Sequence, residues 1–302
     1  MQDEKMSAAT PLKGGVLAAV GQLPQDEAVL ARAIEVAADS GVSLTVVHVL
    51  DVAMTDWMAP DVTTLRHQAE LSVRDDIVAA LARLGADESA TVLIEVGTPS
   101  ARLLEVCEER RPGLIVMRAH ENPRIVEKLL GSTTDRVIHL ARAPVLVIKR
   151  PVERPYRRAL VATDGTDEAA LAMSFVANAL PKAVLYLVQA VHIPQQLKSA
   201  MLRAGEGQGA ITAHREAMEQ RAADYLHGLA RGLDRAQPAV TTRVLSGDPA
   251  FCLVRATRSP KVDVMVVGPG RTNIIRRALI GSVTRKLIRD AACDVLVYRV
   301  DE

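Results

Sequence analysis

The chain has 302 residues, twice the roughly 150 of a common single domain, so we expect two domains. Hydrophobic residues make up 49% and charged residues 24%, which excludes a disordered chain. One Trp, four Tyr and two Phe offer few rings for stacking bases, which argues against single-stranded nucleic-acid binding. The net charge of +1 is the sum of an acidic half and a basic half. Residues 1–150 carry 16 Lys and Arg against 21 Asp and Glu, whereas residues 151–302 carry 21 Lys and Arg against 15 Asp and Glu. Two domains with different partners or ligands would explain this division, and drift in surface charge is the alternative.

Short aliphatic runs alternate along the chain with longer segments of helical periodicity. In the first half we predict strands over Gly15–Val20, Leu44–Leu50, Thr91–Val96, Leu114–Met117 and Val145–Lys149, with helices over Glu27–Asp39, Thr64–Leu84, Arg102–Glu109 and Thr133–Leu140. The second half repeats the strands over Arg158–Thr163, Ala183–Val188, Val240–Leu245, Val262–Val267 and Val295–Arg299. Such β-branched, nearly continuous apolar runs are typical of parallel strands that helices cover on both faces. Each half is therefore predicted to be a doubly wound α/β domain with a five-stranded parallel sheet.

The two halves match in register. Gly97-Thr-Pro99 recurs as Gly247-Asp-Pro249, and Gly131-Ser-Thr-Thr134 recurs as Gly281-Ser-Val-Thr284, both at an offset of 150 residues. The first strands match at an offset of 143, so we predict that the second half gained residues, in the polar stretch 198–209. The chain is thus a tandem duplication, with domains expected at residues 1–150 and 151–302. A stiff, charged linker with two prolines, residues 149–158, joins them.

Ligands of doubly wound sheets bind beyond the carboxyl ends of the strands, where helix N-termini suit phosphate groups. In the second half these places hold Asp164 after the first strand, Gly268 after the fourth, and Gly281-Ser-Val-Thr284 before the last helix. With these residues in place, each half resembles a universal stress protein (Usp) domain, and the resemblance covers nearly the whole chain from about Gly14 to Val300. It implies the fold of the adenine-nucleotide alpha-hydrolase type, with the two domains packed as a pseudo-dimer through their last strands.

Nucleotide-binding members of that family carry an Asp after the first strand and a glycine motif, G-x-x-G-x9-G-(S/T), after the fourth. The resemblance implies that the Asp holds the adenosine part of ATP, or of a related adenine nucleotide, while the glycines and the Ser wrap its phosphates. The nucleotide could bring Mg²⁺ with it. By this resemblance the ligand residues of the second half are Asp164, Val267, Gly268, Arg271, Gly281, Ser282, Val283 and Thr284.

The motif is incomplete in both halves. Arg271 stands where the second glycine is required, so it either obstructs the approach of a phosphate or supplies a guanidinium to the same oxygens. In the first half, Gly21 replaces the Asp, and Arg118 and Glu121 replace the two loop glycines. Glu121 would repel phosphate. We therefore predict nucleotide binding in the second half only, with a structural or partner-facing first half.

Other conspicuous residues favour structural roles. We expect Asp248 and Thr98 to cap the helices that follow them and His48 to be a hydrogen-bonded packing residue. The isolated Cys107, Cys252 and Cys293 are expected to be small core residues of a reduced protein. No catalytic set, metal-binding spacing, signal peptide or membrane span is recognisable.

We therefore predict a cytoplasmic stress-response protein that acts through ligand-dependent interaction with protein partners and is not an enzyme. A nucleotide-free scaffold, in which both sites are relics, is the first alternative. A slow nucleotide hydrolase is the second. A homodimer of two such chains is a further open possibility, whereas binding to membranes or nucleic acid is not expected.

Overall fold

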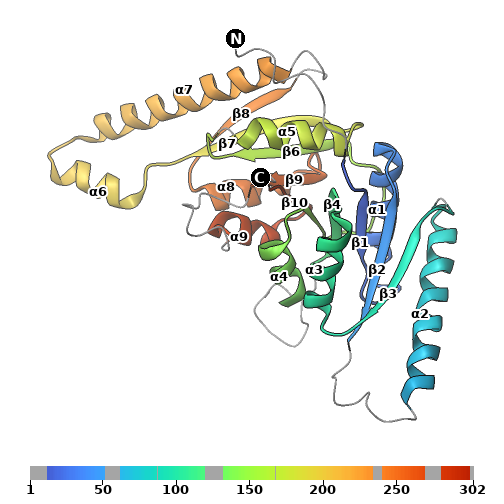
Figure 1. The fold of residues 1–302 in the computed structure, drawn as a ribbon. Helices are drawn as coiled ribbons and strands as arrows, with labels where there is room; N and C mark the ends of the chain where they lie inside the picture. The colour runs from blue at the N-terminus through green and yellow to red at the C-terminus, as the bar shows by residue number, and fades with distance from the viewer. Residues whose placement is uncertain are drawn as a thin grey trace.

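The computed structural model describes residues 12–51, 62–86, 88–119, 132–166, 168–233, 240–268 and 280–299 (Figure 1). The first half consists of β1 (Val16–Ala19), α1 (Glu27–Ser40), β2 (Leu44–Leu50), α2 (Val62–Arg83), β3 (Thr91–Val96), α3 (Pro99–Arg110), β4 (Leu114–Arg118), α4 (Ser132–Leu140) and β5 (Val145–Ile148). The second half consists of β6 (Arg158–Thr163), α5 (Glu168–Ala179), β7 (Val184–Val191), α6 (Gln195–Arg203), α7 (Gln208–Leu233), β8 (Thr241–Ser246), α8 (Pro249–Thr257), β9 (Val264–Val267), α9 (Ser282–Asp290) and β10 (Asp294–Val297). The alternation of strands and helices confirms the predicted α/β fold class.

All ten strands form one sheet in the order β3-β2-β1-β4-β5-β10-β9-β6-β7-β8. Pairing is parallel within each half, whereas β5 and β10 pair antiparallel, with Val147 opposite Val295 and Leu146 opposite Leu296. The last strand of each half would otherwise be an exposed edge, and each covers the other. This pairing confirms the predicted pseudo-dimer through the last strands.

The two faces of the sheet are covered by different helices, and both cores run through the two halves. One core packs α1, α2, α5 and α7 against the sheet, with Leu30 and Met173 as fully buried members. The other packs α3, α4, α8 and α9, with Ile138 and Leu287 fully buried. Because strands inside such a sandwich are buried on both faces, their sequences are continuously apolar and do not alternate with polar residues.

The two halves also cap each other's last helices. Lys149 follows β5, and its Nζ atom donates to the carbonyl oxygens of Arg289 at 3.0 Å and Ala291 at 2.7 Å, at the end of α9. Arg299 follows β10, and its guanidinium donates to the Ile138 carbonyl oxygen at 2.8 Å, near the end of α4. A cation at a helix C-terminus satisfies carbonyls that have no intrahelical partner. These reciprocal contacts strengthen the β5–β10 seam.

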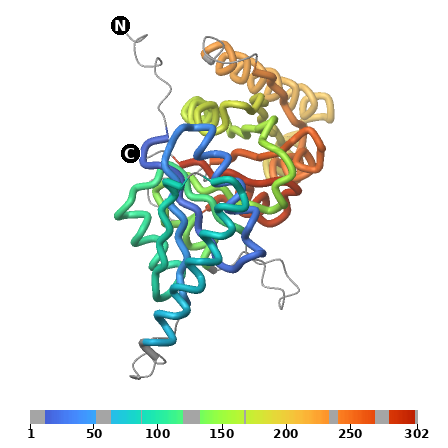
Figure 2. Tube along the Cα trace, turned by 90° about the vertical axis from the view of Figure 1, so that its right-hand side faces the viewer, coloured from blue at the N-terminus to red at the C-terminus, as the bar shows by residue number. Residues whose placement is uncertain are grey.

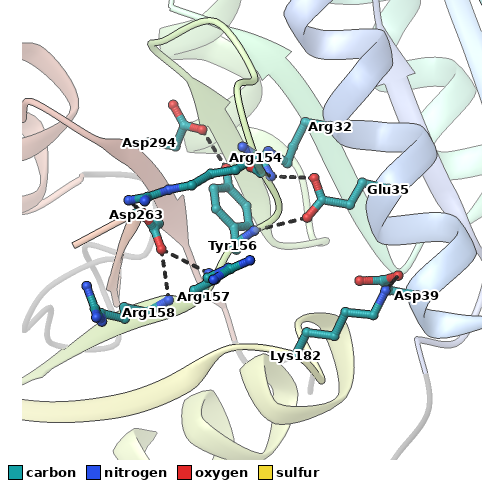
Figure 3. A network of polar contacts seen from close by, with 10 residues as sticks. All are labelled: Arg32, Glu35, Asp39, Arg154, Tyr156, Arg157, Arg158, Lys182, Asp263 and Asp294. Atoms are coloured by element: carbon teal, nitrogen blue, oxygen red, sulfur yellow. Dashed lines mark hydrogen bonds and ion pairs between the residues drawn. The ribbon is translucent and has the colours of Figure 1, made fainter. Parts of the chain in front are cut away.

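The linker at residues 149–158 is held to both halves by side chains (Figure 3). The backbone N–H of Tyr156 donates to Glu35 Oε1 of α1 at 3.1 Å, and its hydroxyl donates to Asp294 Oδ2 at the start of β10 at 2.6 Å. The Arg32 guanidinium lies 3.5 Å from the centre of the Tyr156 ring, a cation–π contact. The linker therefore connects α1 of the first half to the sheet of the second.

The predicted insertion in the second half takes the form of α6 and the start of α7. Helix α6 has no buried residue, and Leu197 and Leu202 on it are 43% and 45% exposed. A short turn joins α6 to α7 (Figure 1), and α7 packs on β7 and β8. Figure 2 shows α2 and the α6–α7 pair extending from opposite ends of the molecule.

The predicted helix caps and buried cysteines have different outcomes in the structure. Asp248 caps α8, because its Oδ1 accepts from the Phe251 N–H at 2.9 Å. Thr98 occupies the N-cap position of α3 without a side-chain cap bond, so its predicted capping role is wrong. All three cysteines are buried, and burial raises the pKa of Cys107 and Cys293 to about 12. Both thiols are therefore protonated at neutral pH.

Candidate functional site

The turn after β6 presents Asp164 at the carboxyl edge of the sheet. Gly165 follows with φ +89°, a conformation that favours glycine. The turn is fixed by two hydrogen bonds, from the Gly165 N–H to Thr163 Oγ1 at 3.0 Å and from the Thr166 N–H to Asp164 Oδ1 at 3.2 Å. Since β6 lies beside β9, Asp164 stands at the point where the strand order of the second half reverses, as predicted.

A cavity of about 320 Å³ opens beside this turn. Its lining comes from the turn, from the end of β7 and from α7, and consists of Asp164, Gly165, Gln189, Val191, Met218, Arg221, Ala222 and Tyr225. The Tyr225 hydroxyl also donates to the Thr166 carbonyl oxygen, so α7 is fastened to the Asp164 turn. The α7 residues could not be predicted from the sequence, because no sequence pattern indicates which face of a long polar helix turns toward a distant loop.

The remaining predicted ligand residues lie around the N-terminus of α9. Gly281 is the N-cap of this helix and makes no side-chain cap bond, and Ser282 is its first, exposed residue. Val267 is the buried last residue of β9, and Val283 is half-buried. Arg271 lies outside the described residues. The cavity lining includes Asp164 and none of these α9 or β9 residues.

Thr284 is buried, and its hydroxyl donates to the Gly268 carbonyl oxygen at 2.8 Å. The first half has the same contact, because the Thr134 hydroxyl donates to the Arg118 carbonyl oxygen at 2.9 Å. A bond found in both halves joins the last helix to the end of the fourth strand. The hydroxyl proton of Thr284 is thus engaged within the protein, and this residue places Gly268 beside the N-terminus of α9.

In the first half the corresponding turn is filled by the protein's own side chains. Asp26 is 1% exposed, and its Oδ2 accepts from the N–H groups of Gly21 at 2.7 Å and Gln22 at 3.2 Å. The Arg118 guanidinium donates to the Gln25 carbonyl oxygen at 2.9 Å and lies 3.6 Å from Asp26 Oδ1. Sequence reasoning identified the missing Asp at Gly21 but not this replacement five residues later. Glu121 lies outside the described residues.

Asp26→Ala is expected to lower the free energy of unfolding by about 2–3 kcal/mol, because two N–H groups of the loop would lose a buried acceptor. Urea unfolding at neutral pH measures this loss. Glu108→Ala is the matched control, since Glu108 is an exposed carboxylate in the same half, and its effect should stay within about 0.5 kcal/mol. Equal effects of the two substitutions would contradict a structural role of Asp26.

The fold and the carboxyl-edge turns define a tandem α/β protein with one open and one filled turn. The Universal stress protein family model matches residues 15–149 and again residues 155–299. The chain belongs to this family and contains its domain twice, which confirms the predicted resemblance.

Individual relatives match parts of the chain. Universal stress protein MJ0577 of Methanocaldococcus jannaschii is 38% identical over 58 residues, which cover 19% of this chain and 36% of that protein. Universal stress protein Rv2005c of Mycobacterium tuberculosis is 27% identical over 141 residues, 46% of this chain and 47% of that protein. The matched segments therefore span less than half of these two relatives. The crystal structure of a universal stress protein from Archaeoglobus fulgidus shares the fold over 95% of this chain and 97% of that one, with a TM-score of 0.66 and 18% identity.

No helix in the part of the chain that the structure describes is both long and apolar enough to cross a bilayer.

Proposed function

We propose that the second half, residues 151–302, binds ATP or a related adenine nucleotide, and that the first half does not. The contrast between the two turns supports this proposal most directly. The second-half turn presents Asp164 to an open cavity of about 320 Å³, whereas the first-half turn is filled by Asp26 and bounded by Arg118. A carboxylate at an open cavity can accept hydrogen bonds from ribose hydroxyls.

The phosphate end of the nucleotide is proposed to lie at the N-terminus of α9. The first N–H groups of a helix have no intrahelical partner and carry partial positive charge, which suits phosphate oxygens. Gly281 leaves this end without a side-chain cap, and the exposed Ser282 adds a hydroxyl donor. Gly268 and Arg271 are proposed to complete the phosphate site, and Thr284 positions it through Gly268. Mg²⁺ would enter with the nucleotide.

The proposed role is regulatory, without turnover. Nucleotide binding would fix the Asp164 turn and its neighbours, and protein partners would recognise the altered surface. The filled first-half turn supports a structural or partner-facing first half. If the second half also binds no nucleotide, the alternative hypothesis of a nucleotide-free scaffold applies.

Thermal unfolding with and without millimolar ATP and Mg²⁺ tests the proposal, because a ligand that binds only the native state stabilises it by about 2.7 kcal/mol at one hundred times its Kd. Asp164→Asn retains the shape and an acceptor for the Thr166 N–H, but it removes the charge. We expect this variant to lose most of the ATP-induced shift of the melting temperature while it melts normally without ligand.

Ser282→Ala and Ser132→Ala form a matched pair, because the same residue is changed at the same repeat position. Ser282→Ala should reduce the ATP-induced shift, and Ser132→Ala should leave it intact. Absence of any shift with the unmodified chain would overturn the proposal, and equal losses in the two serine variants would overturn its assignment to the second half. Release of phosphate during the assay would instead identify a slow hydrolase.

A further inference from the structure

The cavity beside Asp164 has one wall formed by a single face of α7. Its α7 residues recur at spacings of three and four, which places their side chains on one side of the helix; they are Met218, Arg221, Ala222 and Tyr225. Since the Tyr225 hydroxyl is used by the Thr166 carbonyl, this residue offers its ring to the cavity as a largely apolar surface. Such a wall suits the face of a flat heterocycle.

Gln189 of β7 also lines the cavity, and its side-chain oxygen has no hydrogen-bond partner among the described residues. Its Oε1 is shielded from water and accepts no hydrogen bond from any residue that the structure describes. Its Nε2 lies toward the turn, where a Cβ added to Gly165 would be only 3.1 Å away. A buried amide oxygen without a donor is costly, and an N–H group of a ligand would remove that cost.

His48 occupies the position in the first half that corresponds to Gln189 in the second half. The strand pairings place Leu44 beside Val16 and Leu185 beside Ala159, so His48 and Gln189, each four residues further on, occupy the same position. His48 Nδ1 lies 3.0 Å from the Val20 carbonyl oxygen and is hydrogen-bonded to it. The polar group of the first half is thus used by the fold, whereas the amide oxygen of the second half is not.

We propose that Gln189 is a specificity-determining residue that recognises the base of the bound nucleotide, with the α7 face as the wall against which the base lies. This inference rests on the proposed function. A carboxamide presents one acceptor and one donor, which match the amino group and N7 of adenine. Hypoxanthine presents two acceptors on this edge, a carbonyl oxygen in place of the amino group and N7, so no orientation of the Gln189 amide can pair with both. The site should therefore select ATP over ITP.

Calorimetric titration of the full chain with ATP and with ITP, both in Mg²⁺, tests this selection. The unmodified chain should bind ITP at least about tenfold more weakly than ATP, because a lost hydrogen bond leaves the amide oxygen unpaired. Gln189→Leu should weaken ATP binding about tenfold and bring the ATP-to-ITP ratio close to one. Its melting temperature without ligand should be unchanged or higher, since leucine removes an unpaired buried oxygen.

Gln220→Leu is the matched control, because Gln220 is also on the second half but bonds Asp224 on the exposed side of α7 at 3.0 Å. It should retain the ATP-to-ITP ratio of the unmodified chain. Equal binding of ATP and ITP by the unmodified chain, or an unchanged ratio in Gln189→Leu, overturns this inference and leaves the proposed function standing. Binding of neither nucleotide overturns both.

Discussion

Alanine in place of Asp294 is expected to lower the free energy of unfolding by about 3–5 kcal/mol. Asp294 is 3% exposed and accepts the Tyr156 hydroxyl at 2.6 Å and the Lys149 N–H at 2.8 Å (Figure 3). Alanine would leave the buried Tyr156 hydroxyl and the part-buried Lys149 N–H without this acceptor, and it would release the linker from β10. Urea unfolding at neutral pH measures the loss.

Asp294→Asn separates the acceptor role from the charge. The amide oxygen can still accept from Lys149, and its NH₂ group can donate to the Tyr156 oxygen, so we expect a loss of about 1 kcal/mol or less. Nearly equal losses in the Ala and Asn variants would contradict the role of Asp294 as a buried acceptor.

The Asn variant also makes a pH prediction. Burial is the largest cause that shifts the pKa of Asp294, and it raises the pKa above the ordinary 3.8 against the opposing hydrogen bond from Tyr156. A raised carboxyl pKa contributes stability that is fully present below pH 3.8 and is lost as the pH rises through the folded-state value. The Asn variant lacks this dependence, so its stability relative to the unmodified chain should increase as the pH rises from about 3.5 to 7.

The strands and helices could be predicted because the patterns that mark them are local in the sequence and occur in both halves. The strand predicted over Thr91–Val96 is observed with the same bounds as β3, and the helix predicted over Thr64–Leu84 is observed over Val62–Arg83. The continuous aliphatic runs of inner strands such as β9, which is buried throughout, leave few alternatives, because both faces of such a strand are covered. The β5–β10 pairing followed from the resemblance together with the apolar character of both last strands.

The contacts of the linker could not be predicted in the same way. Tyr156 and Asp294 lie 138 residues apart, and Arg32 is a charged residue on a helix that would ordinarily be assigned to the solvent side. Arg32 is only 4% exposed, because its guanidinium makes a cation–π contact with the Tyr156 ring and an ion pair with Glu35. Partnerships of this kind depend on how the two halves meet, and neither half carries a local signal for them.

The candidate site was predictable only where a motif marks it. Asp164 and Gly268 are observed at the expected ends of neighbouring strands, because the alternation of strands and helices sets those positions. The replacement of the lost Asp by Asp26 depends on a loop that folds back on itself, and the wall contributed by Tyr225 depends on the orientation of α7. Neither the loop geometry nor the helix orientation leaves a pattern in the sequence.

Leu296→Ala is expected to lower the free energy of unfolding by about 2–5 kcal/mol, and to weaken both halves together. Leu296 is 2% exposed in the core that also contains Leu30 of the first half and Met173 of the second, and it pairs with Leu146 across the seam. Because this core is continuous, a cavity at Leu296 should make local unfolding more frequent in both halves, on either side of the β5–β10 pairing.

Hydrogen exchange of the full chain, followed by mass spectrometry of its peptides, reports each half separately. In Leu296→Ala the slowest peptides of α1 and of α5 should lose protection by similar factors, since both helices pack into the core of Leu30 and Met173. Leu171→Ala is the control, because Leu171 lies on α5 but is 50% exposed, and it should change protection little. Loss of protection confined to the second half would show that the halves unfold independently. Loss of protection in both halves would mean that the halves unfold together. A nucleotide bound to the second half would then also stabilise the first half, which is proposed to face a partner.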